Sequence, residues 1–152
     1  MSTVKAKLVV ILSRFPFPLE KGDKLRAFNQ IRELSDDFEI HLIAISGTSI
    51  SDETKNKLAP YCQSIHIIRI NAWSIFLNCC LCLLSNKPFQ TGYFYSYAGK
   101  QKVKQLLKAI NPNYIYCQLI RVSEYVKDYH HCPKTLDYMD ALSVGIERRI
   151  SK

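Results

Sequence analysis

Short apolar runs alternate with amphipathic segments along this chain of 152 residues. Five of the runs are rich in large apolar residues and are bounded by turn residues, a pattern typical of strands. They lie at residues 7–13, 38–46, 64–70, 114–118 and 134–138. Because these runs are apolar nearly throughout, we expect a sheet that is covered on both faces.

Helical periodicity marks two of the segments between these strands. Helices are predicted over residues 24–35 and 98–110, where apolar residues recur every three or four positions. The residues expected to face inward are Leu25, Phe28, Ile31 and Leu34 in the first helix and Val103, Leu106, Leu107 and Ile110 in the second.

Three further helices are predicted from shorter signals. Residues 49–53 supply serines for an N-cap and two acids for a first turn, in a helix that ends near Pro60. Another helix is expected after the fourth strand. A last helix is expected after the fifth strand, with Asp140 as its N-cap. The apolar residues of the helix after the fourth strand are Leu119, Val122, Val126 and Tyr129.

Strands that alternate with helices of about ten to fifteen residues indicate right-handed βαβ units. We therefore predict an α/β fold, in which one domain holds a doubly wound, mainly parallel, Rossmann-like sheet. Open parallel sheets bind ligands beyond the carboxyl ends of their strands, so a site is expected at that edge.

The connection after the first strand has the features of an anion site. Pro16 and Pro18 lie in a connector, and Gly22 and Asp23 then open the first helix. Such a strand, glycine-bearing loop and helix N-terminus present backbone N–H groups and the positive end of the helix dipole to a phosphorylated ligand. Neither G-x-G-x-x-G nor the GK[S/T] of a P-loop occurs, so the segment is not a dinucleotide fingerprint or a P-loop.

The chain is basic, with 21 Lys and Arg against 13 Asp and Glu and a net charge of +8. This balance favours anionic partners, such as nucleotide or phosphate ligands or an acidic membrane surface. The basic residues are scattered and no aromatic-basic RNA signature occurs. Nucleic acid is therefore not an expected partner.

The six cysteines do not indicate a metal site. Cys79, Cys80 and Cys82 lack zinc spacing, and the His-His-Cys stretch at residues 130–132 is interpreted as a turn. Most of the cysteines lie in apolar runs, where a free thiol behaves as a small hydrophobe. With no cleavable signal peptide in the sequence, we expect a reduced, cytoplasmic protein without a metal or other cofactor.

Two motifs carry a resemblance to a known family. Residues 18–26 follow the pattern P-x-x-K-G-D-K-x-R after the first strand, and residues 137–143 follow D-x-x-D-A-x-S after the fifth. With these motifs, essentially the whole chain resembles the N-terminal half of bacterial family 4 glycosyltransferases, the group 1 sugar transferases with the GT-B fold.

The resemblance implies an enzyme of two Rossmann-like domains with a cleft between them. The N-terminal domain binds mainly the acceptor, and the C-terminal domain binds the nucleotide-sugar donor. Residues 1–152 are accordingly expected to form the acceptor-side domain, with the donor domain absent from this chain and no sugar transfer by the chain alone.

The resemblance also implies roles for the first motif. Gly22 would let the backbone approach the donor diphosphate, and Lys24 and Arg26 would contribute charge toward a diphosphate or an anionic acceptor. A purely structural interpretation stands beside each role. Gly22 would permit a turn, Asp23 would cap the helix, and the two basic side chains would face solvent.

Two other strand ends offer candidates for substrate binding. After the fourth strand, Gln118 can hydrogen-bond hydroxyls but cannot titrate, and Arg121 is a candidate ligand for an acceptor or a phosphate. Many relatives have a His or an acidic side chain near Gln118, so no acid/base role is expected there. After the fifth strand, the candidates are Asp137, Asp140 and Ser143, with an N-cap as the alternative for Asp140. The catalytic residue stays unknown.

Residues 72–84, with the sequence AWSIFLNCCLCLL, form an apolar run too short to span a bilayer, which needs about 20 residues. One interpretation is a helix buried against the sheet. The other is an interfacial helix that places Trp73 and Phe76 among anionic lipid headgroups. The aromatic residues 89–97 are expected either to line the acceptor side of the cleft or to form a buried connector.

Two functions therefore remain open. The first is the acceptor half of a glycosyltransferase that transfers a sugar from a nucleotide sugar to a saccharide or lipid-linked acceptor in cell-surface polysaccharide synthesis. The second is a non-enzymatic Rossmann-like or flavodoxin-like module that binds a phosphorylated ligand. A receiver domain is excluded, because the acidic pair after the first strand and the phosphorylatable Asp after the third are missing.

Overall fold

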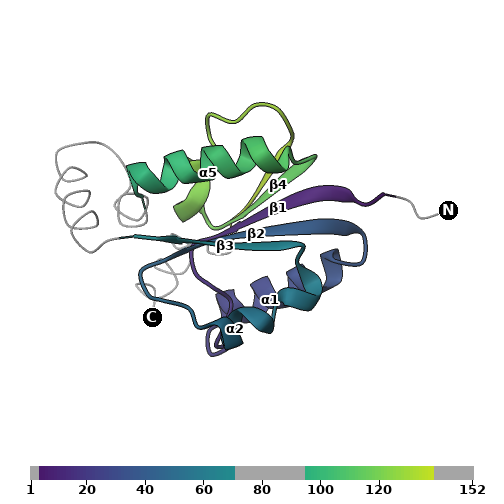
Figure 1. Ribbon diagram of the computed structural model, residues 1–152, viewed down its shortest axis with the longest axis vertical. Helices are drawn as coiled ribbons and strands as arrows, with labels where there is room; N and C mark the ends of the chain where they lie inside the picture. The colour runs from purple at the N-terminus through teal and green to yellow at the C-terminus, as the bar shows by residue number, and fades with distance from the viewer. Residues whose placement is uncertain (1–3, 71–94, 139–152) are drawn as a thin grey trace, which may run out of the picture.

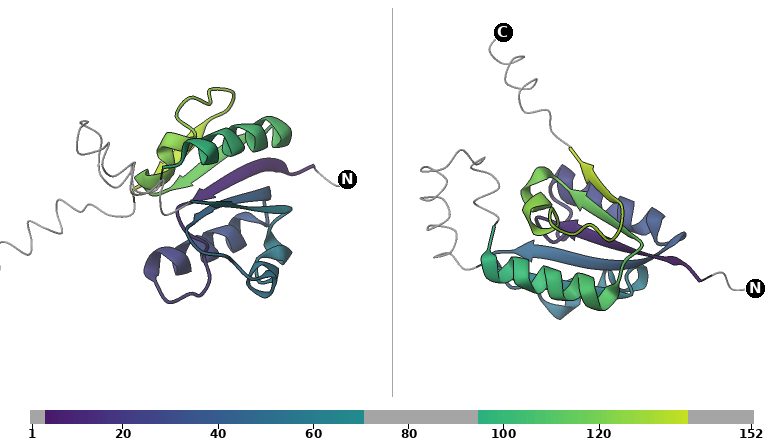
Figure 2. Two further views of the ribbon diagram at one scale, coloured as in Figure 1. Left: turned by 60° about the vertical axis from the view of Figure 1, so that its left-hand side comes forward. Right: turned by 90° about the horizontal axis from the view of Figure 1, so that it is seen from above.

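The computed structural model describes residues 4–70 and 95–138. Within them, five parallel strands form one sheet in the order β3-β2-β1-β4-β5 (Figure 1). The strands are β1 (Ala6–Leu12), β2 (Phe38–Ser46), β3 (Ser64–Arg69), β4 (Tyr114–Gln118) and β5 (Lys134–Asp137). The helices are α1 (Gly22–Leu34), α2 (Asp52–Asn56) and α5 (Tyr97–Ile110), with the 3₁₀ helices η1 (Ala59–Tyr61) and η2 (Ile120–Tyr125). Helices α1 and α2 lie on one side of the sheet and α5 on the other (Figures 1 and 2), which confirms the predicted α/β, doubly wound fold.

The sheet separates two apolar cores. Val9 and Ile11 of β1 belong to the core beneath α5, whereas Val10 and Leu12 belong to the core beneath α1. All four side chains are at most 1% exposed. Successive side chains of a strand point to opposite faces, so covering both faces requires the continuous apolar runs that the sequence shows.

Helix α1 begins at Gly22, slightly before the predicted start, and buries Ala27 and Ile31. Phe28 and Leu34 pack beside them as predicted, but the inward placement of Leu25 is wrong, because its side chain is 45% exposed. Each helical residue turns by about 100°, so a residue two positions before Ala27 lies about 200° around the helix from it. The buried stripe is therefore centred on a small alanine, not on the leucine.

Helix α5 agrees with its prediction. Ser96 caps its first turn by accepting a hydrogen bond from the Gly99 N–H at 3.2 Å. Asn111, in the left-handed conformation with φ of 50°, ends the helix. Val103 and Leu107 are buried against the sheet, as their spacing predicts.

The helix predicted near Pro60 is interrupted. Ser51 caps α2 by accepting a hydrogen bond from the Thr54 N–H at 3.3 Å, and this helix ends at Asn56. The chain then forms the separate 3₁₀ turn η1, which has Pro60 in its first turn. Proline lacks an N–H and clashes with the preceding turn, so one continuous helix to this point is unfavourable.

The prediction of an α-helix after β4 is wrong, because the short 3₁₀ helix η2 forms there instead. Leu119 has φ of 69° and ψ of 148°, and its N–H donates to the Asp137 carbonyl at 2.9 Å. The backbone is thus still paired with β5 when it turns. Ser123 Oγ then donates to the Ile120 carbonyl at 2.8 Å, a local bond to the third preceding residue within the tighter turn. The last predicted helix, with Asp140, lies outside the described residues.

Candidate functional site

The strand order creates a switch point beside β1. From β1 the chain proceeds outward to β2 and β3, and it later returns to place β4 on the opposite side of β1. The connections that leave β1 and β4 therefore diverge, and a crevice opens between their carboxyl ends. Five polar side chains and one alanine line this narrow crevice: Ser13, Arg14, Asp23, Lys24, Ala27 and Gln118.

Three of the predicted site residues, Asp23, Lys24 and Gln118, thus come together in this crevice. The Gln118 amide donates to the Asp23 carbonyl at 3.1 Å, which joins the end of β4 to the start of α1. Arg14 approaches the Asp23 carboxylate at 3.8 Å, a loose ion pair. The helix-capping interpretation of Asp23 is wrong, because Lys21 is the N-cap residue and the cap has no side-chain hydrogen bond. Asp23 instead lies in the first turn, where a carboxylate interacts favourably with the helix dipole.

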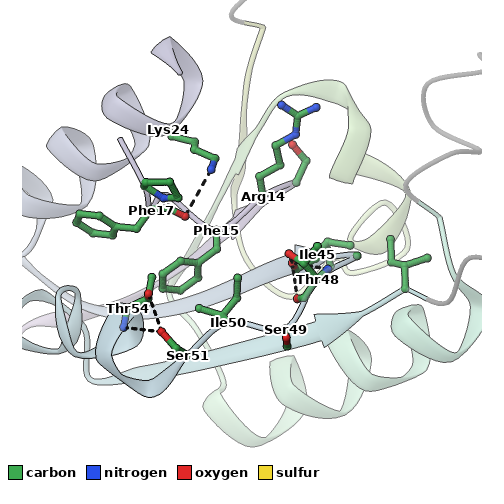
Figure 3. Close-up of a pocket in the computed structure, with 15 residues that line it drawn as sticks. Arg14, Phe15, Phe17, Lys24, Ile45, Thr48, Ser49, Ile50, Ser51 and Thr54 are labelled. Carbon is green, nitrogen blue, oxygen red and sulfur yellow. Dashed lines mark hydrogen bonds between the residues drawn. The ribbon is translucent and has the colours of Figure 1, made fainter. Parts of the chain in front are cut away.

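A larger pocket of about 520 Å³ adjoins this crevice, over the carboxyl ends of β1, β2 and β3 (Figure 3). Lys24 and Arg14 line both spaces. They are the only charged side chains among the described residues of the pocket wall. The wall also carries six hydroxyl side chains, from Ser13, Ser46, Thr48, Ser49, Ser51 and Thr54.

The geometry of the wall suits a ligand with both a charged part and an apolar or ring-shaped part. Phe15, Phe17 and Ile50 are the apolar residues beside Lys24 in the pocket wall (Figure 3), and the Phe17 ring is directed away from Lys24 and packs against Phe28. The Lys24 ammonium donates only a long bond, 3.4 Å, to the Phe17 carbonyl, so it keeps capacity for a stronger acceptor. With two cations and no carboxylate in the described wall, the pocket favours an anion.

Residues 46–49 were missed as site residues by the sequence analysis. This loop follows β2 and lines the pocket. It folds back on itself: Ser46 Oγ donates to the Thr48 carbonyl at 2.9 Å and accepts from the Thr48 N–H at 3.2 Å. The signal was present in the sequence Ser-Gly-Thr-Ser, which begins at the last residue of the second strand, at the edge where parallel sheets bind ligands.

Gly22 does not serve as a turn glycine. It is the first residue of α1, and no glycine of the described chain has a positive φ. A Cβ built on Gly22 would meet no heavy atom within 4 Å. The turn interpretation is therefore wrong. Gly22 lines neither the crevice nor the pocket, and the space that a side chain would occupy at this position is open.

Arg26 is directed to β5 and lines neither space. Its guanidinium pairs with the Asp137 carboxylate at 2.8 Å. The Tyr116 hydroxyl donates to the same carboxylate at 2.7 Å and lies 2.9 Å from the side-chain oxygen of Gln30. Burial, followed by the hydrogen bond to the Asp137 carboxylate, raises the pKa of Tyr116 above its usual range. Asp137 thus ties α1 to the ends of β4 and β5.

The structure does not place the remaining predicted site residues, Arg121, Asp140 and Ser143, in this site. Arg121 lies half-buried in η2 and lines neither space. Asp140 and Ser143 lie outside the described residues, as do residues 72–84 and most of the aromatic stretch that follows them.

Three further properties of the described part of the chain limit its chemistry. No three His, Cys, Asp or Glu side chains of that part gather as a metal-binding group. None of its helices combines the length and apolar character needed to cross a bilayer. Burial raises the pKa of the Cys62 and Cys117 thiols to about 12, so both are poor nucleophiles at neutral pH.

The geometry assembles a cationic, hydroxyl-rich pocket beside the switch point of a Rossmann-like sheet. Comparison with protein-family models gives no match for this chain, and comparison with curated proteins gives none either.

Proposed function

We propose that this chain is the acceptor-side domain of a glycosyltransferase with the GT-B fold. The observation that supports it best is the pocket beside the switch point, which Arg14 and Lys24 line together with six hydroxyl side chains and with no carboxylate among the described lining residues. The two basic groups would bind a phosphate, and the hydroxyls would hydrogen-bond a saccharide. The first motif, residues 18–26, and Asp137 of the second motif lie at this same edge of the sheet.

The proposal assigns a limited role to this chain. Gln118 orients the first turn of α1 through the Asp23 carbonyl, and as an amide it does not exchange protons with a substrate. A separate donor-binding domain would bring the nucleotide sugar to the open space beside Gly22. Transfer in a two-walled cleft requires groups from both walls at hydrogen-bonding distance. The chain of 152 residues alone is therefore expected not to transfer sugar.

A second candidate function is a non-enzymatic module that binds a phosphorylated ligand. The same pocket favours it, because the two cations would hold a phosphate whether or not a saccharide is attached. The two proposals differ in what the hydroxyl-rich loop at residues 46–49 does. Only the first proposal needs that loop to recognise sugar hydroxyls.

Calorimetric titration of the full chain with three probes tests the first proposal: glucose 1-phosphate, inorganic phosphate and UDP-glucose. Glucose 1-phosphate should bind more tightly than inorganic phosphate, and Lys24→Met should weaken its binding about fivefold, as expected for loss of one partly exposed charge contact. Lys21→Met is the matched control. Lys21 precedes the same helix and lines neither the pocket nor the crevice, so its loss should change the affinity less than twofold.

A transfer assay completes the test. Radiolabelled UDP-glucose should be consumed only when the chain is combined with a donor domain of a family 4 glycosyltransferase. Equal affinity for glucose 1-phosphate and inorganic phosphate would favour the binding module instead. Sugar transfer by the chain alone would contradict the division of roles proposed here.

A further inference from the structure

A second groove, of about 310 Å³, lies on the α5 face of the sheet. It opens between α5 and the segment that leads from η2 toward β5, and it shares no described lining residue with the pocket at the switch point. In Figures 1 and 2 this connecting segment runs beside α5 on the same side of the sheet.

The short 3₁₀ connection explains why a groove exists here. In a doubly wound sheet, a full α-helix after β4 would pack alongside α5. Here η2 buries Val122 and Tyr125 and then gives way to an irregular turn. The tighter, shorter element covers less of α5 than an α-helix would, and part of the helix surface stays open to solvent.

Three lysines of α5 line the groove: Lys100, Lys104 and Lys108. Residues four apart lie on one side of a helix, so the three form a row about 12 Å long. Lys100 is paired with Asp128 at 2.5 Å, and Asp128 is the one acidic residue of the described lining. Lys104 and Lys108 make no ion pair with an acidic side chain of the described residues, so their charge is available to an anion.

Aromatic side chains form the rest of the surface. Tyr97 lines the groove and is 69% exposed, so its ring is accessible to a ligand. Tyr129 packs edge-on against His131 with ring centroids 5.1 Å apart, and both residues line the groove. Tyrosine offers an apolar face and a polar hydroxyl together, the combination that suits a ring bearing hydroxyl groups.

We propose that this groove binds an acidic saccharide at a site distinct from the switch point. Its rings would pack against Tyr97 and Tyr129, and its carboxylate or phosphate groups would contact Lys104 and Lys108. The lysine row is about 12 Å long and the groove holds about 310 Å³, so a short segment of two or three sugar rings matches it better than a long nucleic-acid track. The inference rests on the groove alone and does not require glycosyl transfer.

Binding of a hyaluronan tetrasaccharide, which carries glucuronate carboxylates, tests the proposal by calorimetric titration of the full chain. Neutral chitotetraose should bind at least tenfold more weakly, because it lacks the carboxylates. Lys104→Glu should weaken tetrasaccharide binding at least fivefold, and Tyr97→Ala should weaken it about as much.

Matched controls come from the same chain. Lys102 is an exposed lysine of α5 outside the groove lining, so Lys102→Glu should change the affinity less than twofold despite its equal change in charge. Tyr138→Ala, at a ring that is 67% exposed elsewhere, should also leave it unchanged. The side chains of Tyr97, Lys102, Lys104 and Tyr138 are all exposed. The melting temperatures of the four variants should therefore stay within about a degree of that of the parent chain.

Four results would overturn the proposal. They are no detectable binding at millimolar tetrasaccharide, equal losses for Lys102→Glu and Lys104→Glu, equal affinity for chitotetraose, and binding of UMP as tight as that of the tetrasaccharide. The last would make the groove a nucleotide site. Lys24→Met separates this test from the proposed function: if it abolishes tetrasaccharide binding while Lys104→Glu does not, the saccharide occupies the switch-point pocket instead.

Discussion

Two glycines in first turns of helices should respond oppositely to the same substitution. A Cβ built on Gly99, in α5, would lie 3.1 Å from Ile68 Cγ2, 3.2 Å from Tyr125 Cε1 and 3.3 Å from Ser96 Cβ. A Cβ built on Gly22, in α1, would meet nothing within 4 Å. Neither glycine has a positive φ, so alanine fits both backbones and packing alone separates the two cases.

The expected size follows from two opposing terms. Alanine in place of glycine favours a helix by up to about 1 kcal/mol, and less at the first position. At Gly99 the added methyl must push apart β3, η2 and the helix cap by a few tenths of an ångström. Overpacking of this kind costs about 1–3 kcal/mol. The net expectation for Gly99→Ala is a loss of about 1–2 kcal/mol in the free energy of unfolding, and for Gly22→Ala a gain of a few tenths.

Urea unfolding followed by circular dichroism measures both differences. For a chain of 152 residues, a loss of 1–2 kcal/mol lowers the melting temperature by about 2–8 °C. A Gly99→Ala variant as stable as the parent would show that Ile68 and Tyr125 move aside at no cost, and the packing argument would fail. Destabilisation by Gly22→Ala would show that the open space beside α1 is occupied in solution.

Two further predictions concern buried polar groups. Burial raises the thiol pKa of Cys62 and Cys117 from 9.0 to about 12. The free energy of unfolding should therefore fall as the pH rises above about 9, because the unfolded chain releases thiol protons that the folded chain retains. Urea titrations at pH 8 and pH 10 should show this fall, and a Cys62→Ala/Cys117→Ala variant should show a smaller one. Tyr116→Phe removes the hydroxyl that donates to Asp137. The free energy of unfolding, measured by urea titration at pH 7, should fall by about 0.5–1.5 kcal/mol relative to the parent chain. An unchanged value would mean that water replaces this hydrogen bond without loss.

The strands could be predicted from the sequence because burial on both faces leaves an unmistakable mark. In β1 and β2, nearly every position is apolar, and the structure places these side chains in two cores. Helix α5 was predictable for a related reason, since Val103 and Leu107 lie on one strongly apolar side. Helix α1 was harder, because its buried stripe rests on Ala27, whose small side chain gives a weak periodic signal.

The connection after β4 could not be predicted from periodicity. Leu119, Val122 and Val126 are spaced as in an α-helix, and all three are indeed buried. What excludes the α-helix is a backbone bond from the Leu119 N–H to the Asp137 carbonyl, made to a strand that follows later in the chain. Such a long-range bond leaves no trace in the local sequence.

The candidate site was only partly accessible to sequence reasoning, for a similar reason. Gln118 and Asp23 were expected at strand and helix ends, but their contact depends on β4 returning to lie beside β1. Arg14 was passed over because it lies between a strand and prolines, where it resembles an ordinary loop residue. The strand order turns that position into part of the wall of both the pocket and the crevice.

The strand order also separates charge across the switch point. On the β2 and β3 side, the described pocket wall offers hydroxyls and the cationic groups of Arg14 and Lys24, with no carboxylate. On the β4 and β5 side, Asp23 approaches Arg14 and Asp137 pairs with Arg26, so carboxylates there are already engaged with cations. An anion entering this edge is attracted toward β2 and β3 and meets bound carboxylates on the other side. The strands that flank β1 therefore determine on which side of this edge the phosphate of a ligand would lie. This holds for any phosphorylated ligand.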